Sequence, residues 1–288
     1  MTLQIWALDG IGEIRSGDDL AAVIVAHLDG PLQTGDVVVV TSKIVSKAAG
    51  QATTGNRDDL LVAETDRVVA RRGPTRIVRT HGGLTLAAAG IDASNLEAGT
   101  VIPLPRDPDG DARDIRAGLQ RLTGAEVGVI ITDTAGRAWR VGQTDLAIGA
   151  AGIVPSLSFD GVVDAYGNVL AVTAPAVADE IASASDLVAG KLGGRPVVIV
   201  RGLPREWFDP GAPGASALIR DEDGDLFGLG LARRGAGRGR LRRRGCVGSL
   251  RPRLVTTCCR WHGKESIPHS RSSTRSMASG GLCGRRHT

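Results

Sequence analysis

The balance of charges changes abruptly near residue 230, and this change determines which part of the chain can form a folded core. Residues 1–230 contain 20 Lys and Arg against 30 Asp and Glu, whereas residues 231–288 contain 15 against 1. The second segment also shows neither the helical period of about 3.6 residues nor the strand period of about 2. Such a segment cannot bury enough apolar surface to offset the entropy lost on ordering. We therefore expect residues 1–230 to fold and residues 231–288 to form a basic, disordered tail.

The basic tail has three competing interpretations. Its charge could make it a nucleic-acid-binding arm. Its Cys258, His262, Cys283 and His287 could bind zinc, although their spacing matches no zinc-finger pattern. An Arg-, Ser- and Cys-containing stretch without an apolar pattern is also what a GC-rich gene yields when it is read out of frame, and we favour this hypothesis. All four cysteines of the chain lie in the tail, so residues 1–230 can form no disulfide and no thiolate zinc site.

Composition excludes several classes of function for residues 1–230. Aromatic residues make up only 3% of the chain, which disfavours stacking platforms for single-stranded nucleic acid. The longest stretch without a charged residue, 146–159, is shorter than the roughly 20 apolar residues of a membrane-spanning helix. The first nine residues carry one acid and no base, unlike a secretory signal. We therefore expect a cytoplasmic enzyme or binding protein.

Hydrophobic patterns predict a fold that mixes α and β structure. Short β-branched runs, typical of buried strands, lie at residues 36–41, 127–132 and 196–200. Apolar residues spaced three and four apart, which predict helices, lie at residues 18–27, 59–72, 111–122 and 177–192. Proline, glycine and aspartate crowd residues 103–110, which we expect to connect two subdomains.

The predicted folded part lacks the common nucleotide-binding and hydrolase motifs. It has no Gly-x-x-x-x-Gly-Lys-Ser/Thr loop, no Gly-x-Gly-x-x-Gly after a strand, no Gly-x-Ser-x-Gly elbow and no His-Glu-x-x-His. Its only histidines are His27 and His81. Carboxylate and hydroxyl oxygens remain as the reactive groups, and these prefer hard cations such as Mg²⁺ or Mn²⁺.

Two acidic segments could supply such oxygens. Asp133 and Thr134 follow a predicted buried strand and precede two cations, Arg137 and Arg140, so this segment could bind a metal ion and a phosphate. Asp92 lies in a second predicted turn, two residues after Gly90. Either aspartate could instead cap a helix or a turn, and spacing alone does not decide between these roles.

Residues 41–47 follow another predicted strand. Ser42, Lys43, Lys47 and backbone N–H groups could bind an anion there, where a helix begins. The alternative is an exposed loop with solvated lysines.

Together these segments resemble the coenzyme F420-0:L-glutamate ligase family. The resemblance extends from residue 5 to residue 230, and it lies in residues 11–20, 35–47, 88–95, 131–140 and 142–149. It is strongest to the ligase half of the actinobacterial bifunctional form, in which an FMN-binding nitroreductase-like domain follows. No such domain is visible here, which agrees with the reading-frame hypothesis.

The resemblance implies an α+β fold of two subdomains that forms a homodimer, with the site in a groove near the dimer interface. It implies that GTP contacts Ile11, Gly12, Glu13, Ile14, Ser42, Lys47 and Asn95. It also implies that Asp92 and Asp133 hold one divalent ion, Mg²⁺ or Mn²⁺, that Thr134 helps to hold a second, and that K⁺ is a further candidate ion. A later nucleotide loop of the family would fall near residues 214–217.

The activity implied by the resemblance is the GTP-dependent addition of L-glutamate to F420-0, a deazaflavin cofactor precursor. The terminal carboxylate of F420-0 would attack the γ-phosphate of GTP, and the glutamate amine would then displace phosphate from the acyl phosphate. Lys47 and Asp133 would be the catalytic residues, acting by charge and positioning. The alternatives are a metal-dependent nucleotide phosphohydrolase and a nucleic-acid-binding protein that uses the tail. We expect no membrane partner and no specific nucleic acid.

Overall fold

The structure is a computed structural model that describes residues 2–93, 99–221 and 224–225. The chain divides into two units, residues 1–239 and residues 240–288, and only the first contains described residues. The predicted tail, with its zinc, nucleic-acid and reading-frame hypotheses, lies outside the described residues, as does Asn95. The domain boundary at residue 230 stays a prediction.

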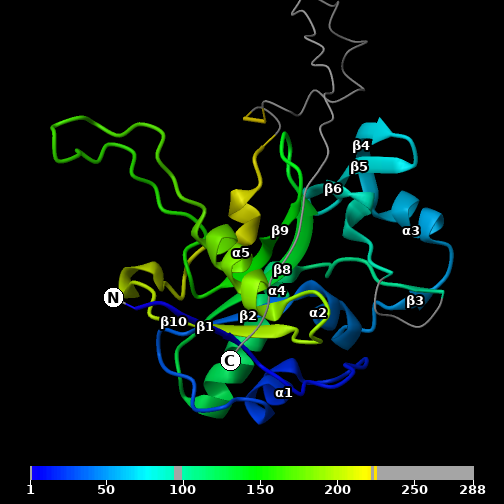
Figure 1. The fold of residues 1–288 in the computed structure, drawn as a ribbon, viewed down its shortest axis with the longest axis horizontal. Helices are drawn as coiled ribbons and strands as arrows, with labels where there is room; N and C mark the ends of the chain where they lie inside the picture. Colours follow the sequence, from blue (N-terminus) through cyan, green and yellow to red (C-terminus); the bar gives the residue numbers. More distant parts are fainter. Residues whose placement is uncertain (1, 94–98, 222–223, 226–288) are drawn as a thin grey trace, which may run out of the picture. The chain divides into compact units, whose positions relative to one another are not determined.

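A five-stranded sheet forms the centre of the described part (Figure 1). In spatial order its strands are β1 (Gln4–Ala7), β10 (Val197–Arg201), β2 (Val37–Thr41), β8 (Gly128–Gly136) and β9 (Gln143–Ala151). Only β2 and β8 pair in parallel, and the other neighbours are antiparallel. The three strands predicted from β-branched runs are confirmed as β2, β8 and β10. These runs are almost wholly apolar because the strands lie in the middle of the sheet and are buried on both faces.

Helices cover both faces of this sheet. They are α1 (Leu20–Ala26), α2 (Ser42–Ala48), α4 (Pro108–Thr123) and α5 (Val177–Ala189). Side chains of α1, α2 and α4 share one buried cluster with Val38, Val40 and Ile131. Side chains of α5 share another with Val39 and Ile130. Successive residues of β8 therefore point alternately toward α2 and toward α5.

A smaller set of elements lies between β2 and α4 in the sequence. It contains β3 (Thr53–Thr54), α3 (Arg57–Glu64), β4 (Thr65–Arg72), β5 (Thr75–Thr80), β6 (Thr85–Ala87), a 3₁₀ turn (Ala88–Gly90) and β7 (Thr100–Val101). The strands form a three-stranded sheet, β4-β5-β6, and a β3-β7 pair. A separate core of Leu61, Val78, Ala89, Ile91 and Val101 holds them together.

The predicted helix over residues 59–72 is wrong in its second half. The helix ends at Glu64, and Thr65–Arg72 form β4, which pairs with β5 across a turn at Gly73 and Pro74. Thr65, Val68 and Val69 are β-branched, and a Gly-Pro turn leads into a second β-branched run, a pattern typical of a hairpin. Pairing of β4 with β5 therefore decides the structure of these residues, although their apolar spacing also fits a helix.

The other helix predictions are confirmed with shifted ends. Helix α4 begins at Pro108, because Asp107 caps it by accepting a 2.9 Å hydrogen bond from Gly110 N. The expected connection at residues 103–110 therefore lies at 103–107, and the division into two subdomains that it suggested stays a prediction. Helix α5 stops at Ala189, before the predicted residue 192. The α+β fold is confirmed, and no described helix has the length and apolar character to cross a membrane.

Candidate active site

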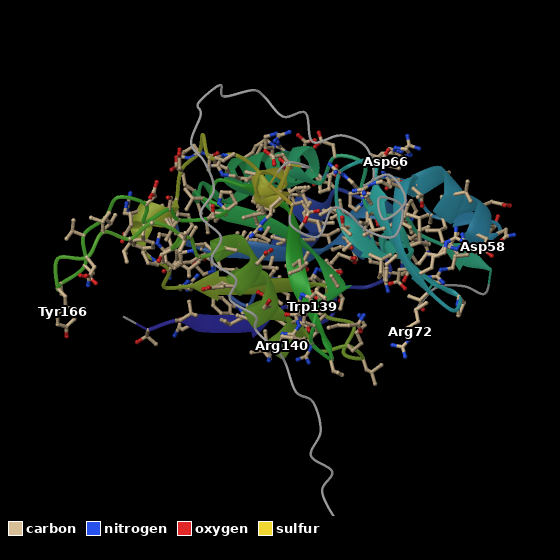
Figure 2. The ribbon with its side chains drawn as sticks, turned by 90° about the horizontal axis from the view of Figure 1, so that it is seen from above. Asp58, Asp66, Arg72, Trp139, Arg140 and Tyr166 are labelled. Carbon is tan, nitrogen blue, oxygen red and sulfur yellow. The ribbon has the colours of Figure 1, made fainter. Side chains whose placement is uncertain are left out.

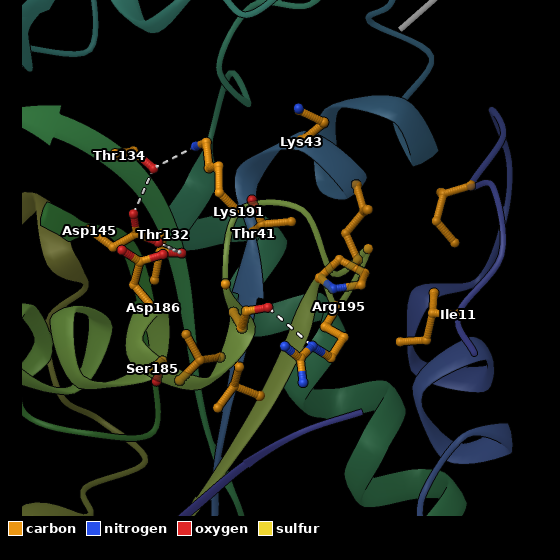
Figure 3. Close-up of a pocket in the computed structure, with 18 of the residues that line it drawn as sticks. Ile11, Thr41, Lys43, Thr132, Thr134, Asp145, Ser185, Asp186, Lys191 and Arg195 are labelled. Atoms are coloured by element: carbon orange, nitrogen blue, oxygen red, sulfur yellow. Dashed lines mark hydrogen bonds between the residues drawn. The ribbon is translucent and has the colours of Figure 1, made fainter. Parts of the chain in front are cut away.

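A cavity of about 460 Å³ lies where β2 ends and β8 passes Thr132 (Figure 3). Its lining comes from residues 11–14, strand β2, helix α2, the paired strands β8 and β9, the end of α5, the loop that follows α5, and the start of β10. The polar and charged side chains that line it are Glu13, Thr41, Lys43, Lys47, Thr132, Thr134, Asp145, Ser185, Asp186, Lys191 and Arg195. The cavity therefore combines a group of cations with a group of carboxylates and hydroxyls.

Asp145 anchors the carboxylate and hydroxyl group. It accepts hydrogen bonds from Thr134 Oγ1 at 2.7 Å and from Thr132 Oγ1 at 3.2 Å (Figure 3). The antiparallel register of β8 and β9 places Thr134 opposite Asp145, and Thr132 lies on the same face two residues earlier in β8. Burial raises the pKa of Asp145, and the charge of Asp186 adds to this, while the two threonine hydrogen bonds oppose it. Lys191 Nζ donates to Thr134 Oγ1 at 3.4 Å.

Asp133 points to the other face of β8, toward α2. It accepts a hydrogen bond from Ser42 Oγ at 3.1 Å. Burial raises the pKa of Asp133 from 3.8 to about 7, the Ser42 hydrogen bond opposes this, and the charges of Asp145 and Asp92 add to it. Among the residues that the structure describes, no cation pairs with Asp133. Its half-buried carboxylate thus has a hydroxyl partner but no counter-charge among the described residues.

A second, smaller cavity of about 60 Å³ brings Ser42, Asp92, Asp133 and Thr134 together. It shares Thr41, Lys43, Thr134 and Lys191 with the larger cavity, so the two adjoin. Asp92 reaches it from the smaller sheet region, where its backbone bridges to Ile102. Its side chain forms a 2.7 Å ion pair with Lys43. Asp133 does not cap a turn, which was the alternative for it, because it lies inside β8. The helix-capping alternative for Asp92 is not tested, because residues 94–98 lie outside the described part.

These residues fit a divalent cation that is shared with a phosphate ligand. Within residues 2–93, 99–221 and 224–225, no three acidic, histidine or cysteine side chains gather closely enough to hold a metal ion alone. Mg²⁺, however, is commonly bound by one or two carboxylates together with substrate phosphates. Asp92 and Asp133 supply the carboxylates of that donor set, and the lack of a counter-charge at Asp133 is the feature that a cation would satisfy. The Thr134 hydroxyl points to the other face of β8, so it would serve a second ion.

The cations of the cavity come from two places. Lys47 on α2 is only 9% exposed and forms a 2.5 Å ion pair with Glu13. Lys191 and Arg195 come from a Gly-rich loop, residues 190–195, and Arg195 Nε donates to Ala189 O at 3.1 Å. Three lysines and an arginine at one cavity make it suited to a polyphosphate.

Comparison with known proteins gives the family. Residues 10–58 and 56–202 match the family model described as F420-0:Gamma-glutamyl ligase. The chain belongs to this family. Three curated relatives bear the name coenzyme F420:L-glutamate ligase. The protein of Methanothermobacter thermautotrophicus is 36% identical over 252 residues, which is 79% of this chain and 99% of the relative. That of Methanopyrus kandleri is 38% identical over 250 residues (78% and 98%), and that of Methanosarcina mazei is 36% identical over 251 residues (80% and 97%).

The family membership confirms the resemblance seen in the sequence, and the matched ranges include every residue that lines the two cavities. Of the residues predicted to contact the nucleotide, Ile11, Gly12, Glu13, Ile14 and Lys47 line the larger cavity, and Ser42 lines the smaller one. The predicted metal ligands Asp92 and Asp133 line the smaller cavity, and Thr134 lines both. Their roles stay predictions.

Two segments that the sequence analysis considered for ligand binding line neither cavity, and one segment that it did not consider lines the larger cavity. Residues 214–217, expected near the nucleotide, line neither cavity and overlap a 3₁₀ turn, Ala215–Leu218. Residues 190–195 lie at the cavity instead, and their Gly-Lys-Leu-Gly-Gly-Arg sequence is a signal that was overlooked because the helix was expected to continue. Arg137 and Arg140, considered as phosphate ligands, also line neither cavity.

Proposed function

We propose that this protein adds L-glutamate to coenzyme F420-0, using GTP to activate the carboxylate and acting as a homodimer in the cytoplasm. The observation that carries the proposal is the pairing, at two adjoining cavities, of a basic surface suited to a triphosphate with the half-buried carboxylate of Asp133, which has no cation partner among the described residues. The relatives that share 36–38% identity with the chain are named for the same ligation. Their names do not specify the nucleotide.

Amide formation from a carboxylate needs an activated intermediate. In the proposed reaction the terminal carboxylate oxygen of F420-0 attacks the γ-phosphorus of GTP, the bond to the β-phosphate oxygen breaks, and an acyl phosphate and GDP form. The amine of glutamate then attacks the acyl carbon, inorganic phosphate leaves, and the amine loses a proton to solvent. Neither step needs a covalent enzyme nucleophile, so the protein contributes charge and position.

The lysines of the cavity would bind the phosphates. Lys47 is held by Glu13 at 2.5 Å, and this pairing fixes the direction of its ammonium group before the nucleotide arrives. Lys43 and Lys191 line both cavities, so they can contact an anion that extends from one into the other. These charges would stabilise the transferring phosphoryl group without reorganisation during the reaction.

Asp92, Asp133 and Thr134 would hold the divalent ions, Mg²⁺ or Mn²⁺, and K⁺ is a further candidate. Such ions would neutralise charge on the nucleotide phosphates. For Asp92 to serve as a ligand, its ion pair with Lys43 must be exchanged for the cation, which would release the Lys43 ammonium group toward the phosphates.

Mass spectrometry of F420-0 after incubation with the full chain, GTP, Mn²⁺ and L-glutamate tests the proposal. We expect a mass increase of one or more glutamyl units, and release of GDP that requires both F420-0 and glutamate. GTP hydrolysis that needs neither substrate would instead establish the phosphohydrolase alternative. ATP in place of GTP, tested in parallel, shows whether the nucleotide part of the proposal is correct.

A further inference from the structure

The hairpin tip that joins β8 to β9, residues 137–142, exposes large apolar side chains next to cations. Trp139 is 87% exposed and Val141 is 100% exposed, and Arg137 and Arg140 are exposed as well. Figure 2 shows Trp139 and Arg140 near each other. Among the described aromatic residues only Tyr166 is comparably exposed, at 92%, and Figure 2 shows it at the far end of a different loop. A largely exposed Trp side chain with an arginine close on either side in the sequence is an unusual surface feature, because exposure forgoes the free energy that burial of a Trp side chain provides.

The backbone at the tip is strained as well. Trp139 has a φ of +64°, in the left-handed region that residues with a Cβ rarely adopt. Arg137 Nη2 donates to Val141 O at 3.3 Å and closes the turn around it. Glycine at position 139 would remove the strain. An exposed Trp there therefore lowers stability in two ways, through its backbone conformation and through its unburied side chain. Such strain at an exposed position is typical of residues used in binding.

The tip is close to the reacting groups along the chain. It begins three residues after Thr134 and ends three residues before Asp145, so about 10 Å of strand separates it from that pair. The 460 Å³ cavity accommodates one ligand of nucleotide size. The ring system of a second large substrate therefore needs a surface outside the cavity but within reach of the site, and the tip is such a surface.

The geometry points to the tip as the recognition surface for the deazaflavin ring of F420-0, an inference that rests on the proposed function. Trp139 stacks on the flat ring, and Arg137 and Arg140 bind the acidic side chain that leads from the ring to the reacting carboxylate. Both interactions match the chemistry of the ligand, since a planar heterocycle stacks on indole and anionic groups pair with guanidinium. The competing occupant is a second copy of the chain, and the test must separate the two.

Binding is measured by titrating F420-0, followed by its own fluorescence, with the full chain in the absence of GTP. We expect Trp139→Ala to weaken binding about 5- to 100-fold, the range typical of losing one stacking side chain, and Trp139→Phe to restore most of it. Arg140→Gln should weaken binding about 10-fold. The matched controls are Tyr166→Ala, an equally exposed aromatic, and Arg205→Gln, an exposed arginine that lines neither cavity of the site, and both should bind like the unaltered protein.

A glycine substitution separates a binding role from a structural one. Trp139→Gly should raise Tm by about 2–4 °C, because the strain is gone, while it raises the KM for F420-0 and leaves the KM for GTP unchanged. A fall in Tm, or an unchanged KM for F420-0 in a variant that still ligates glutamate, overturns the inference. If Trp139→Gly loses the dimer on size-exclusion chromatography but binds F420-0 as before, the tip contacts a second copy of the chain and the inference is wrong. If the unaltered protein binds F420-0 through Trp139 but forms no product, the proposed function fails and the inference stands.

Discussion

The stability of the Asp133→Asn variant relative to the unaltered protein should increase as the pH rises, although the substitution removes a group of the proposed active site. Burial raises the pKa of Asp133 from 3.8 to about 7, so the folded state holds a proton that the unfolded state has lost between these two values. The free energy of unfolding of the unaltered protein therefore falls across this window, and the penalty is complete above pH 7. Asparagine has no proton to lose and avoids the penalty.

The magnitude follows from the two pKa values. Between pH 5 and pH 8 the cost of ionising Asp133 in the folded state increases by about 2–3 kcal/mol. Asparagine has costs of its own, since its amide group must be buried beside Ser42, but these do not change with pH. The difference in unfolding free energy between variant and unaltered protein should thus rise by about 2–3 kcal/mol over this range, while turnover falls by on the order of 100-fold or more.

Urea denaturation at pH 5, 6.5 and 8, with EDTA present so that no divalent ion binds, measures the difference. Asp164→Asn is the matched control. Hydrogen bonds at an exposed turn, from Tyr166 N, Asn168 N and Asn168 Nδ2, lower the pKa of Asp164. The difference in unfolding free energy between Asp164→Asn and the unaltered protein should therefore not rise between pH 5 and pH 8. Parallel stability curves for Asp133→Asn and the unaltered protein would refute the reasoning, because they would show that Asp133 ionises as freely in the fold as in the unfolded chain.

Three further predictions concern charged groups elsewhere. Lys47→Met should lower kcat/KM for GTP by about 10²–10³ in steady-state assays with little change in Tm, whereas an equal effect on F420-0 alone would assign Lys47 to the other substrate. Asp36→Ala should cost about 3–5 kcal/mol in urea denaturation, because it breaks a buried bidentate pair with Arg201 at 2.7 Å, while Arg113→Ala, which breaks an exposed 3.7 Å pair, should cost less than about 0.5 kcal/mol. Truncation after residue 230 should leave Tm and ligase activity unchanged and abolish salt-sensitive DNA binding in a filter or gel assay, and a large fall in Tm would place the tail in the folded enzyme.

Sequence patterns predicted the middle of the sheet well because its strands are buried on both faces. Runs of Val and Ile favour buried strands there, and the acid and hydroxyl at the end of one run, Asp133 and Thr134, line the smaller cavity, while their roles stay predictions. The failures came where long-range pairing decides the structure. The second half of the helix predicted at residues 59–72 pairs with the next strand instead.

Asp145 and Lys191 show why part of the site escaped prediction. The hydrogen bonds of Asp145 depend on the register of β8 and β9, which places it opposite Thr134 and cannot be deduced from either strand alone. Lys191 was hidden in a predicted helix because Leu187 and Leu192 continue the apolar spacing, yet they are 85% and 94% exposed. Leu187 lies in the last turn of α5, and Gly190, with a φ of +64°, ends the helix before Leu192, so the basic loop begins there.

The topology of the sheet explains why these distant segments meet. Strands β2 and β8 are parallel, so both reach the same edge at their carboxyl ends, with Thr41 opposite Thr132. Strand β10 is antiparallel to β2, so its beginning lies at that edge, and the loop that precedes it, residues 190–195, is delivered to the same cavity. The alternation of β8 then directs Asp133 to the face of α2 and Thr134 to the face of α5. A register slip of one residue in β8 would exchange the two and break both the Ser42 and the Asp145 hydrogen bonds, so the chemistry of the site depends on the buried Val and Ile residues that hold β8 in place.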